Sequence, residues 1–346
     1  MKNYKVLDLF SGAGGLSLGF KLAGFNIIGA IDFNLDAIKT HEKNFYKSLS
    51  IHADITTISE GFIKENFKNV DVIIGGPPCQ GFSNANKWQK LEDDPRNKLF
   101  FEFIKFVEVL KPRVVLIENV KGILTKNGGF ARKSIATILE KHGYRVSFST
   151  LTASDYGVPQ KRTRAFFVAT LENVFKFETL IKGERVYTVK DAISDLYLLE
   201  RNHNLKLNSS TNKLALFLRD SKSITNHEPK YPNEEVMNRI KLVPQGGNWK
   251  DVPASLWKIQ RNNRHSSAYK RLDENSPSIT IDTGHMNYFH PLFNRVPTVR
   301  ESARLQSFPD SFVFEGSITS QYRQVGNAVP PLLSLAIANE IKKLLS

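Results

Sequence analysis

Cysteine is almost absent from this chain, which has one, Cys79, among 346 residues. A single thiol excludes an intrachain disulfide and a metal site built from several cysteines. Two roles remain for it, a small buried apolar residue or a nucleophile. A lone free cysteine also fits a reducing compartment, so we expect a cytoplasmic protein.

Long hydrophobic runs are absent as well. No stretch approaches the ~18–20 apolar residues of a membrane span, although 41% of the residues are hydrophobic, enough for a sizeable core. The first five residues lead directly into a strand pattern, with no apolar signal-peptide core. Without a long apolar run, we expect no membrane partner. His285 and His290 have no further metal ligands beside them in the sequence, so we also expect no metal.

Acidic residues are too few to balance the basic ones. The chain has 34 Asp and Glu against 48 Lys and Arg, a formal net charge of +14. Lys and Arg neutralise phosphates and release counterions, so a nucleic-acid partner is one explanation. A basic protein that binds no polyanion is the other.

Residues 1–170 alternate short apolar strand patterns with helical patterns. Such alternation predicts an α/β fold with a doubly wound parallel sheet. The clearest helix is expected at 97–110, before Pro112. The last two strands are expected to be antiparallel, because too few residues lie between them for a helical crossover. The expected strands are 6–10, 26–31, 50–53, 71–74, 114–118, 145–151 and 164–169.

The pattern changes after residue 170. From about 171 to 290 the periodicity weakens and polar and turn residues dominate, which predicts a smaller, irregular second domain. A helix from Thr298 and a final helix at about 330–345 restore regular structure. We therefore expect three segments: 1–170 as the main domain, 171–290 as the second domain, and 291–346 returning to the first.

Cys79 lies in the segment GGPPCQGFS, residues 75–83, directly after the apolar strand 71–74. Gly-Gly-Pro-Pro ends that strand abruptly and predicts a rigid loop. Because α/β proteins place their chemistry at the carboxyl ends of strands, this position favours a nucleophile over a core residue.

A glycine-rich turn after the first strand indicates a cofactor site. Gly12 and Gly14 let the backbone approach a ligand closely. Asp32, 20 residues after Gly12, and Asp54 end the next two strands, where carboxylates could bind a ribose and an adenine amino group. The alternatives are a helix N-cap for Asp32 and an exposed loop acid for Asp54. No Lys or Arg flanks the turn to bind phosphate, so S-adenosylmethionine fits better than a dinucleotide or ATP.

Three further polar groups accompany Cys79. Glu118 follows the apolar strand 114–117, where a water-poor pocket could raise its pKa and make it an acid; a strand-capping Glu is the alternative. Alternation predicts that one face of a strand carries Gln160, Arg162 and Arg164, whose side chains could hydrogen-bond an anion or the edge of a base. The alternative is a strand face that is exposed to solvent. Residues 324–331 predict a loop that opens the last helix.

These segments together resemble the DNA (cytosine-5)-methyltransferases. The resemblance covers the chain except about 171–290, the variable target-recognition region of that family. It implies transfer of a methyl group from S-adenosylmethionine to carbon 5 of a flipped-out cytosine in a specific double-stranded DNA sequence, leaving S-adenosylhomocysteine. The matching segments occur in the family's order: DLFSGAGGLSLGF (8–20), GGPPCQGFS (75–83), ENV (118–120), QKRTR (160–164), RESARLQSFPD (300–310) and QVGNAVPP (324–331).

The resemblance also implies residue roles. Cys79 would add to carbon 6 of the base, Glu118 would hydrogen-bond the ring N3 and the exocyclic amine, and Arg164 would bind the base oxygen. Arg162 and Arg164 are expected to lower the pKa of Cys79. Family members often carry Glu at the position of Asp32 and an acid at that of Asn34, differences that affect cofactor affinity. The expected cofactor-binding residues are Phe10, Gly12, Gly14, Leu16, Asp32, Asp54, Pro78, Leu99 and Asn327.

Two segments are expected to contact DNA. The resemblance assigns Gln80 and Ser83 to the opened duplex, and Arg96 joins this set. Residues 239–271 hold eight Lys or Arg and one acid, interleaved with Trp249, Trp257, His265 and Tyr269. Arginine can read guanine or clamp phosphate, although a solvated basic surface is the alternative. The expected contacts in this segment are Arg261, Arg264 and Arg271.

The cysteine count also separates rival functions. A tRNA methyltransferase of the same fold carries a second cysteine in a Cys-Phe-Thr motif, and the RNA cytosine methyltransferases use two active-site cysteines. The single cysteine of this chain argues against both functions. An inactive DNA-binding regulator would need none of Cys79, Glu118 and Arg164. We expect a monomer that protects DNA in a bacterial restriction–modification system, beside an endonuclease for the same site; an orphan or phage enzyme would share these features.

Overall fold

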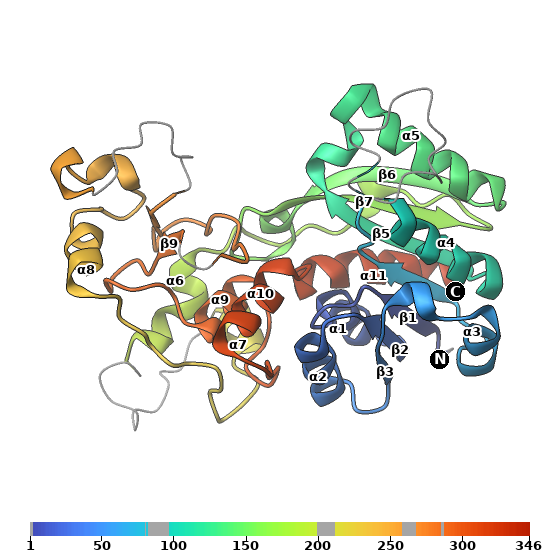
Figure 1. Ribbon diagram of the computed structural model, residues 1–346, viewed down its shortest axis with the longest axis horizontal. Helices are drawn as coiled ribbons and strands as arrows, with labels where there is room; N and C mark the ends of the chain where they lie inside the picture. Colours follow the sequence, from blue (N-terminus) through green and yellow to red (C-terminus); the bar gives the residue numbers. More distant parts are fainter. Residues whose placement is uncertain (1–2, 80, 82–96, 199–211, 258–267, 285–286) are drawn as a thin grey trace. The chain divides into compact units, whose positions relative to one another are not determined.

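The computed structural model describes residues 3–346 apart from 80, 82–96, 199–211, 258–267 and 285–286 (Figure 1). The chain forms two compact units. The first unit comprises Met1–Thr152, Thr163–Lys182 and Pro331–Ser346, and the second unit comprises Ala153–Arg162 and Gly183–Pro330. Residues 291–330, expected in the first domain, thus belong to the second unit, and only the last helix returns. Within the described residues, no helix is long and apolar enough to cross a bilayer.

A seven-stranded sheet forms the centre of the first unit. Its strand order is β3-β2-β1-β4-β5-β7-β6, and every pair is parallel except those that β7 forms with β5 and β6. The doubly wound α/β fold and the antiparallel last pair are therefore confirmed. The strands are β1 Lys5–Leu9, β2 Asn26–Asp32, β3 Leu49–His52, β4 Val72–Gly75, β5 Val114–Val120, β6 Arg145–Thr152 and β7 Thr163–Thr170.

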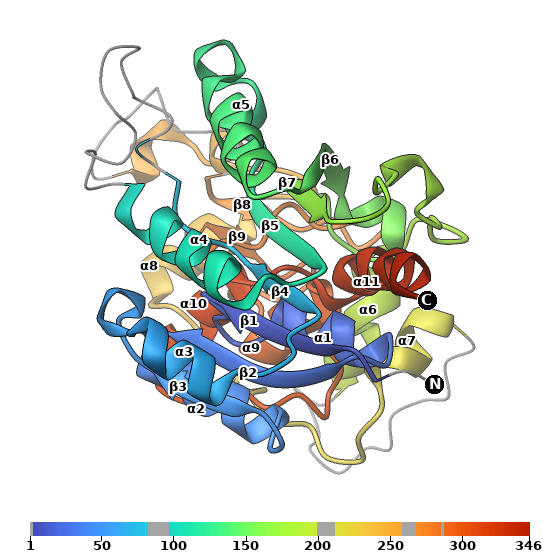
Figure 2. The same ribbon diagram turned by 90° about the vertical axis from the view of Figure 1, so that its right-hand side faces the viewer.

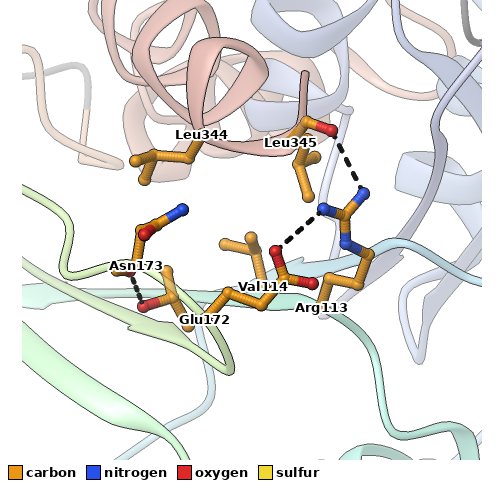
Figure 3. Close-up of a pocket in the computed structure, with 7 residues that line it drawn as sticks. Arg113, Val114, Glu172, Asn173, Leu344 and Leu345 are labelled. Carbon is orange, nitrogen blue, oxygen red and sulfur yellow. Dashed lines mark hydrogen bonds and ion pairs between the residues drawn. The ribbon is translucent and has the colours of Figure 1, made fainter.

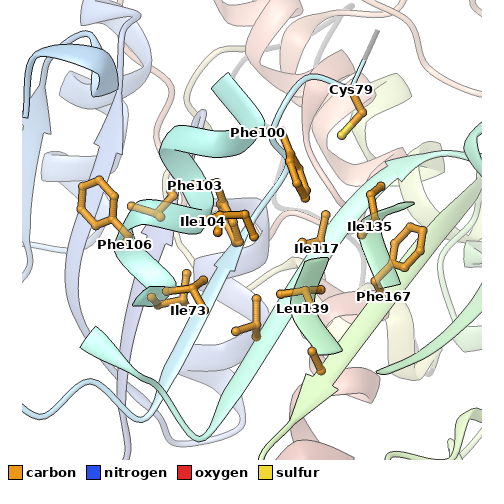
Figure 4. Packing of buried hydrophobic residues seen from close by; sticks show 14 of the residues in the cluster. Ile73, Cys79, Phe100, Phe103, Ile104, Phe106, Ile117, Ile135, Leu139 and Phe167 are labelled. Atoms are coloured by element: carbon orange, nitrogen blue, oxygen red, sulfur yellow. The ribbon is translucent and has the colours of Figure 1, made fainter. Parts of the chain in front are cut away.

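One apolar cluster covers one face of this sheet. Alternate strand residues such as Leu7, Ile73 and Ile117 pack against α3 (Glu60–Asn66), α4 (Lys98–Leu110) and α5 (Lys126–Lys141), and Figure 4 shows part of this packing. Alternation on a strand directs every second side chain to the same face, which explains why these residues cluster. Regular helix in α5 begins only after Gly129, because residues 127–129 have left-handed backbone angles.

The other helices of the first unit are α1 (Gly15–Leu22), α2 (Leu35–Asn44) and α11 (Pro331–Leu345). Figure 2 shows α11 beside α1, on the opposite side of the strands from α4. A Cβ atom at Gly19 would lie 2.3 Å from the Cβ of Ser334, so glycine is required where the two helices touch. The Ser334 hydroxyl donates to the Leu16 carbonyl at 2.8 Å. The end of the chain thus packs against its beginning.

A small pocket lies at the amino end of β5 (Figure 3). There the Arg113 guanidinium donates to the Leu345 carbonyl at 3.2 Å and contacts the Glu172 carboxylate at 3.3 Å. Ligands of doubly wound sheets bind at the carboxyl ends of the strands. This pocket lies at the other end, so we assign its residues to anchoring α11.

The second unit has short helices, a two-stranded parallel sheet and a charged core. Every residue of α9 is buried, including Arg300, Glu301 and Arg304. Residues 324–327 form the end of α10, so the loop expected at 324–331 is shorter and spans only 328–330. The elements are α6 Val189–Ile193, α7 Lys213–Leu218, α8 Glu234–Lys241, α9 Val299–Leu305, α10 Ile318–Asn327, β8 Lys270–Arg271 and β9 Tyr288–Phe289.

Candidate active site

Three strands of the first unit bring an acid, an arginine and the cysteine loop together. Cys79 follows β4, Glu118 lies in β5, and β4 and β5 are neighbours in the sheet. Arg164 pairs in register with Val120, which makes it a diagonal neighbour of Glu118 on the same face. The Arg164 Nε and the Glu118 Oε1 are 3.1 Å apart, with both side chains less than a fifth exposed. The ion pair orients the carboxylate beside the cysteine loop.

Cys79 is held as a buried, protonated thiol. Its side chain is 4% exposed and joins the apolar cluster near Phe100 (Figure 4). The Sγ donates to the Pro77 carbonyl at 3.3 Å. Burial raises the pKa of Cys79 to about 12, a hydrogen bond with Asn119 opposes this shift, and the charge of Glu118 adds to it.

The expectation that two arginines lower the pKa of Cys79 is wrong. The charge of Arg164 is compensated by Glu118, and burial of the thiol dominates. Arg162 belongs to the second unit, where its side chain is buried and donates to the Ile281 carbonyl at 3.2 Å. Burial of the Cys79 thiol thus outweighs any effect of the two arginines on its pKa.

This burial predicts a slow alkylation of Cys79 by iodoacetamide in the free protein. Only the thiolate reacts, and a raised pKa keeps its fraction small at neutral pH. We expect the alkylation rate to rise about tenfold per pH unit from pH 7 to 10 without a plateau. Mass spectrometry of the intact protein measures the rate. In urea the same thiol should level off near its ordinary pKa, and a plateau below pH 9 in the folded protein would contradict the burial.

The expected shared strand face of Gln160, Arg162 and Arg164 does not form. The strand β7 begins at Thr163, so only Arg164 lies in it. Gln160 is buried in the second unit, where its amide donates to the Leu305 carbonyl at 3.2 Å and to Gln306 Oε1 at 3.0 Å. The prediction from alternation required one continuous strand over residues 160–164. The chain instead passes from the second unit to the first between Arg162 and Thr163.

Two neighbours of the catalytic candidates were not predicted. The Asn119 amide donates to the Pro77 carbonyl at 3.1 Å, the same oxygen that the Cys79 thiol contacts. A Cβ atom at Gly76 would lie 3.2 Å from Glu118 Oε2, so glycine leaves room for the carboxylate. Asn119 and Gly76 lie in the same sequence segments as Glu118 and Cys79, but only the contacts in the folded protein show how they position these residues.

The glycine-rich turn after β1 is tied to Asp32. Phe10, Gly12 and Gly14 all have left-handed backbone angles. The Asp32 carboxylate accepts hydrogen bonds from the Gly12 and Asn34 backbone amides, both at 2.8 Å. Burial raises the pKa of Asp32, and these two hydrogen bonds oppose that shift. Asn34, not Asp32, caps α2, so the N-cap alternative for Asp32 is wrong.

The remaining cofactor candidates belong to the first unit, with one exception. Asp54 is exposed, and its Oδ1 accepts a hydrogen bond from the Thr56 amide at 2.9 Å, which lowers its pKa. Asn327 is exposed at the end of α10, in the second unit. Phe10 and Leu99 pack against the apolar cluster, Leu16 is buried and Pro78 is exposed.

Phe33 is a candidate that the sequence reasoning missed. Its ring is 76% exposed directly after Asp32, and its carbonyl contacts the His52 ring at 2.9 Å. An aromatic residue beside a strand-end carboxylate is a signal that could have identified it, since an exposed ring can stack on a purine. Elsewhere in the described parts of the chain, no three His, Cys, Asp or Glu side chains gather as a metal site would require.

The DNA-contact prediction for Arg271 is wrong. This side chain is buried, and its guanidinium donates to the carbonyls of Ile240 and Val243, both at 2.6 Å, and of His290 at 3.1 Å. A guanidinium that satisfies several buried carbonyls holds the second unit together and is not presented to a ligand. Gln80, Ser83, Arg96, Arg261 and Arg264 lie outside the described residues.

Comparison with known proteins agrees with this arrangement. The family model for C-5 cytosine-specific DNA methylases matches residues 4–343. The Type II methyltransferase M1.HphI of Haemophilus parahaemolyticus is 39% identical over 98% of this chain and 86% of its own length. M.DdeI of Desulfomicrobium norvegicum is 37% identical over 97% and 88%. A crystal structure of an Escherichia coli prophage protein assigned as a DNA modification methyltransferase is 30% identical, with a TM-score of 0.79 over 99% of both chains.

Proposed function

Since the chain belongs to the family of C-5 cytosine-specific DNA methylases and methylates carbon 5 of cytosine in DNA, we propose that Cys79, Glu118 and Arg164 are its catalytic residues. One observation carries this proposal. The cysteine loop, the carboxylate and the guanidinium meet at the adjoining ends of β4, β5 and β7, with Glu118 and Arg164 paired at 3.1 Å.

The chemistry requires a nucleophile, because carbon 5 of cytosine does not attack a methyl sulfonium unaided. The Cys79 thiolate adds to carbon 6, and the electron pair of the 5,6 double bond becomes available at carbon 5. Glu118 hydrogen-bonds N3 and the exocyclic amine and so stabilises protonation of the ring as negative charge develops, and Arg164 binds the base oxygen. After carbon 5 is methylated, its proton leaves, the sulfur–carbon bond breaks and the thiolate is released.

The Cys79 side chain would turn during this reaction. In the free protein the thiol is protonated and faces Pro77 and the apolar cluster. A flipped-out cytosine must replace those contacts, because carbon 6 is unreachable inside a stacked duplex. The Asn119 contact to the Pro77 carbonyl would keep the loop in place while the thiol turns away from it.

The residues around the glycine-rich turn fit S-adenosylmethionine, which supplies an electrophilic methyl group when bound. A Cβ atom at Gly12 would meet nothing within 4 Å, so the turn leaves room for a ligand. The Asp32 oxygens each accept one backbone hydrogen bond and have capacity for ribose hydroxyls. Phe33 would stack on the adenine ring, and Asp54 would accept from its amino group.

The relatives support a proposal about the wider setting. They are named Type II methyltransferases, and we place this protein in the same role, as the protective methylase of a restriction–modification pair in the cytoplasm. It would act as a monomer on double-stranded DNA, since one protein meets one flipped base. Residues of the second unit between 183 and 290 would form the target-recognition region. Arg261 and Arg264, outside the described residues, are proposed as its DNA contacts.

A trapping experiment tests the catalytic assignment. In duplex DNA that carries 5-fluorocytosine, carbon 5 has no proton to lose after methylation, so the thiol cannot leave. We expect a covalent protein–DNA complex in the presence of S-adenosylmethionine, with the adduct at Cys79 by peptide mass spectrometry. Cys79→Ser should form none. Labelled methyl transfer to tRNA alone, or an adduct that persists in Cys79→Ser, would overturn the proposal.

A further inference from the structure

A buried polar chain crosses the first unit beneath the glycine-rich turn. The Ser17 hydroxyl, on α1, contacts Asp8 Oδ2 of β1 at 2.6 Å and His41 Nε2 of α2 at 3.3 Å. His41 Nδ1 contacts the Ser50 hydroxyl of β3 at 2.7 Å. Asp8, Ser17 and His41 are all 0% exposed. The mechanism proposed above uses none of these four residues, so their continuous contact across four elements requires another explanation.

The hydrogen-bonded side chains contact the glycine-rich turn directly. An added Cβ atom at Gly14 would lie 2.9 Å from His41 Cδ2 and 2.7 Å from Phe45 Cε2, so the turn rests on these two rings. The rings stack with their centroids 4.3 Å apart. Gly14 precedes the first residue of α1, and Ser17 lies in its first turn. The position of His41 therefore helps to set the position of the turn.

The four side chains Asp8, Ser17, His41 and Ser50 can form two complete sets of hydrogen bonds. If Asp8 is ionised, Ser17 donates to it, His41 Nε2–H donates to Ser17, and Ser50 donates to His41 Nδ1. If Asp8 carries a proton, Asp8 donates to Ser17, Ser17 donates to His41 Nε2, and His41 Nδ1–H donates to Ser50. The two states differ by one proton taken from solvent, and His41 is neutral in both but changes its tautomer.

We propose that this chain is a two-state relay that positions the glycine-rich turn, so that the His41 tautomer and the affinity for the cofactor follow the protonation of Asp8. The proposal rests on the assignment of that turn to the cofactor.

The surroundings place the switch within an accessible pH range. Burial raises the pKa of Asp8 to about 7; its hydrogen bond with Ser17 opposes this shift, and the charge of Asp32 on β2 adds to it. Burial lowers the pKa of His41 to about 3, and the charge of Lys21 on α1 adds to that shift. The strand β4 presents the apolar Ile74 beside Asp8. Asp8 Oδ1 has no hydrogen-bond partner in the described chain, which makes the ionised form costly.

The direction of the effect follows from the two carboxylates. Ribose hydroxyls that donate to Asp32 would offset part of its charge and so lower the pKa of Asp8. Coupling between two sites is reciprocal, so ionised Asp8 must favour cofactor binding by the same factor. Affinity is therefore expected to increase as the pH rises through about 7.

Nitrogen-15 NMR of the His41 ring tests the relay in the cofactor-free protein. We expect the Nδ1–H tautomer at pH 5.5 and the Nε2–H tautomer at pH 8.5. Asp8→Asn retains a donor to Ser17 at every pH and should hold His41 as the Nδ1–H tautomer throughout. Ser17→Ala cuts the chain and should remove the pH response, which keeps a test available if Asp8→Asn does not fold. The same tautomer at both pH values in the wild type would overturn the relay.

Calorimetric binding of S-adenosylhomocysteine tests the link to the turn. We expect the wild-type dissociation constant to fall about threefold from pH 6 to pH 8, and that of Asp8→Asn to stay constant. His142→Gln, which alters a histidine paired with Glu108 on the surface, is the matched control and should keep the wild-type slope. An unchanged slope in Asp8→Asn would refute the link. No binding by the wild type at any pH would instead refute the cofactor site, while the tautomer measurement would still decide on the relay.

Discussion

Replacing Cys79 by serine is expected to lower the rate of methyl transfer to duplex DNA by about 10⁴-fold or more, the scale on which enzymes lose activity without their nucleophile. A hydroxyl is a far weaker nucleophile than a thiolate and does not readily add to carbon 6. Serine matches the size of cysteine and can donate to the Pro77 carbonyl as the thiol does. The loss should therefore reside in the chemical step, measured as initial incorporation of a labelled methyl group from S-adenosylmethionine.

The controls separate chemistry from folding. Cys79→Ser should bind S-adenosylhomocysteine and duplex DNA within about twofold of the wild type and unfold at a similar urea concentration. Because the chain has no other cysteine, no second thiol can replace the lost nucleophile. A rate within tenfold of the wild type in Cys79→Ser would show that the reaction does not pass through this sulfur.

The strands and helices of the first unit could be predicted because their burial is periodic. The helix α4 buries Phe100, Phe103 and Val107 on one side, and β4 is buried along its whole length. Both patterns are visible in the residue types alone. The assignment of 291–330 failed for the opposite reason. All of α9 is buried, charged residues included, so it has no polar face that would indicate which unit it packs in.

The active-site candidates divide along similar lines. Cys79, Glu118 and Arg164 could be identified because each follows or lies in a buried strand, and neighbouring strand ends meet at one edge of the sheet. Arg162 and Arg271 were misassigned because arginine is ordinarily exposed. Here both donate to backbone carbonyls inside the second unit, contacts that depend on residues distant in the sequence. The pKa of Cys79 was misjudged for the same reason, since burial is a property of the fold.

Replacing Arg304 by alanine is expected to lower the free energy of unfolding by about 3–5 kcal/mol, the cost of removing one partner from a buried ion pair. The Arg304 guanidinium donates to both carboxylate oxygens of Asp310, at 2.8 and 2.6 Å, and to Asp195 at 2.7 Å. Its side chain is 0% exposed, and those of the two aspartates are at most 3% exposed. Alanine would leave two buried carboxylates with one fewer counter-charge between them.

Urea denaturation measures this change, because urea does not screen charges as guanidinium does. Arg304→Lys retains the charge but cannot bridge both carboxylates with a planar fork, so we expect an intermediate loss. Arg323→Ala, on the exposed face of α10, is the matched control and should change stability by no more than about 0.5 kcal/mol. A loss below 1 kcal/mol in Arg304→Ala would mean that the carboxylates find other partners. The expected loss would instead show that the charged residues of α9 hold the second unit together, which explains why a helix without a polar face is stable there.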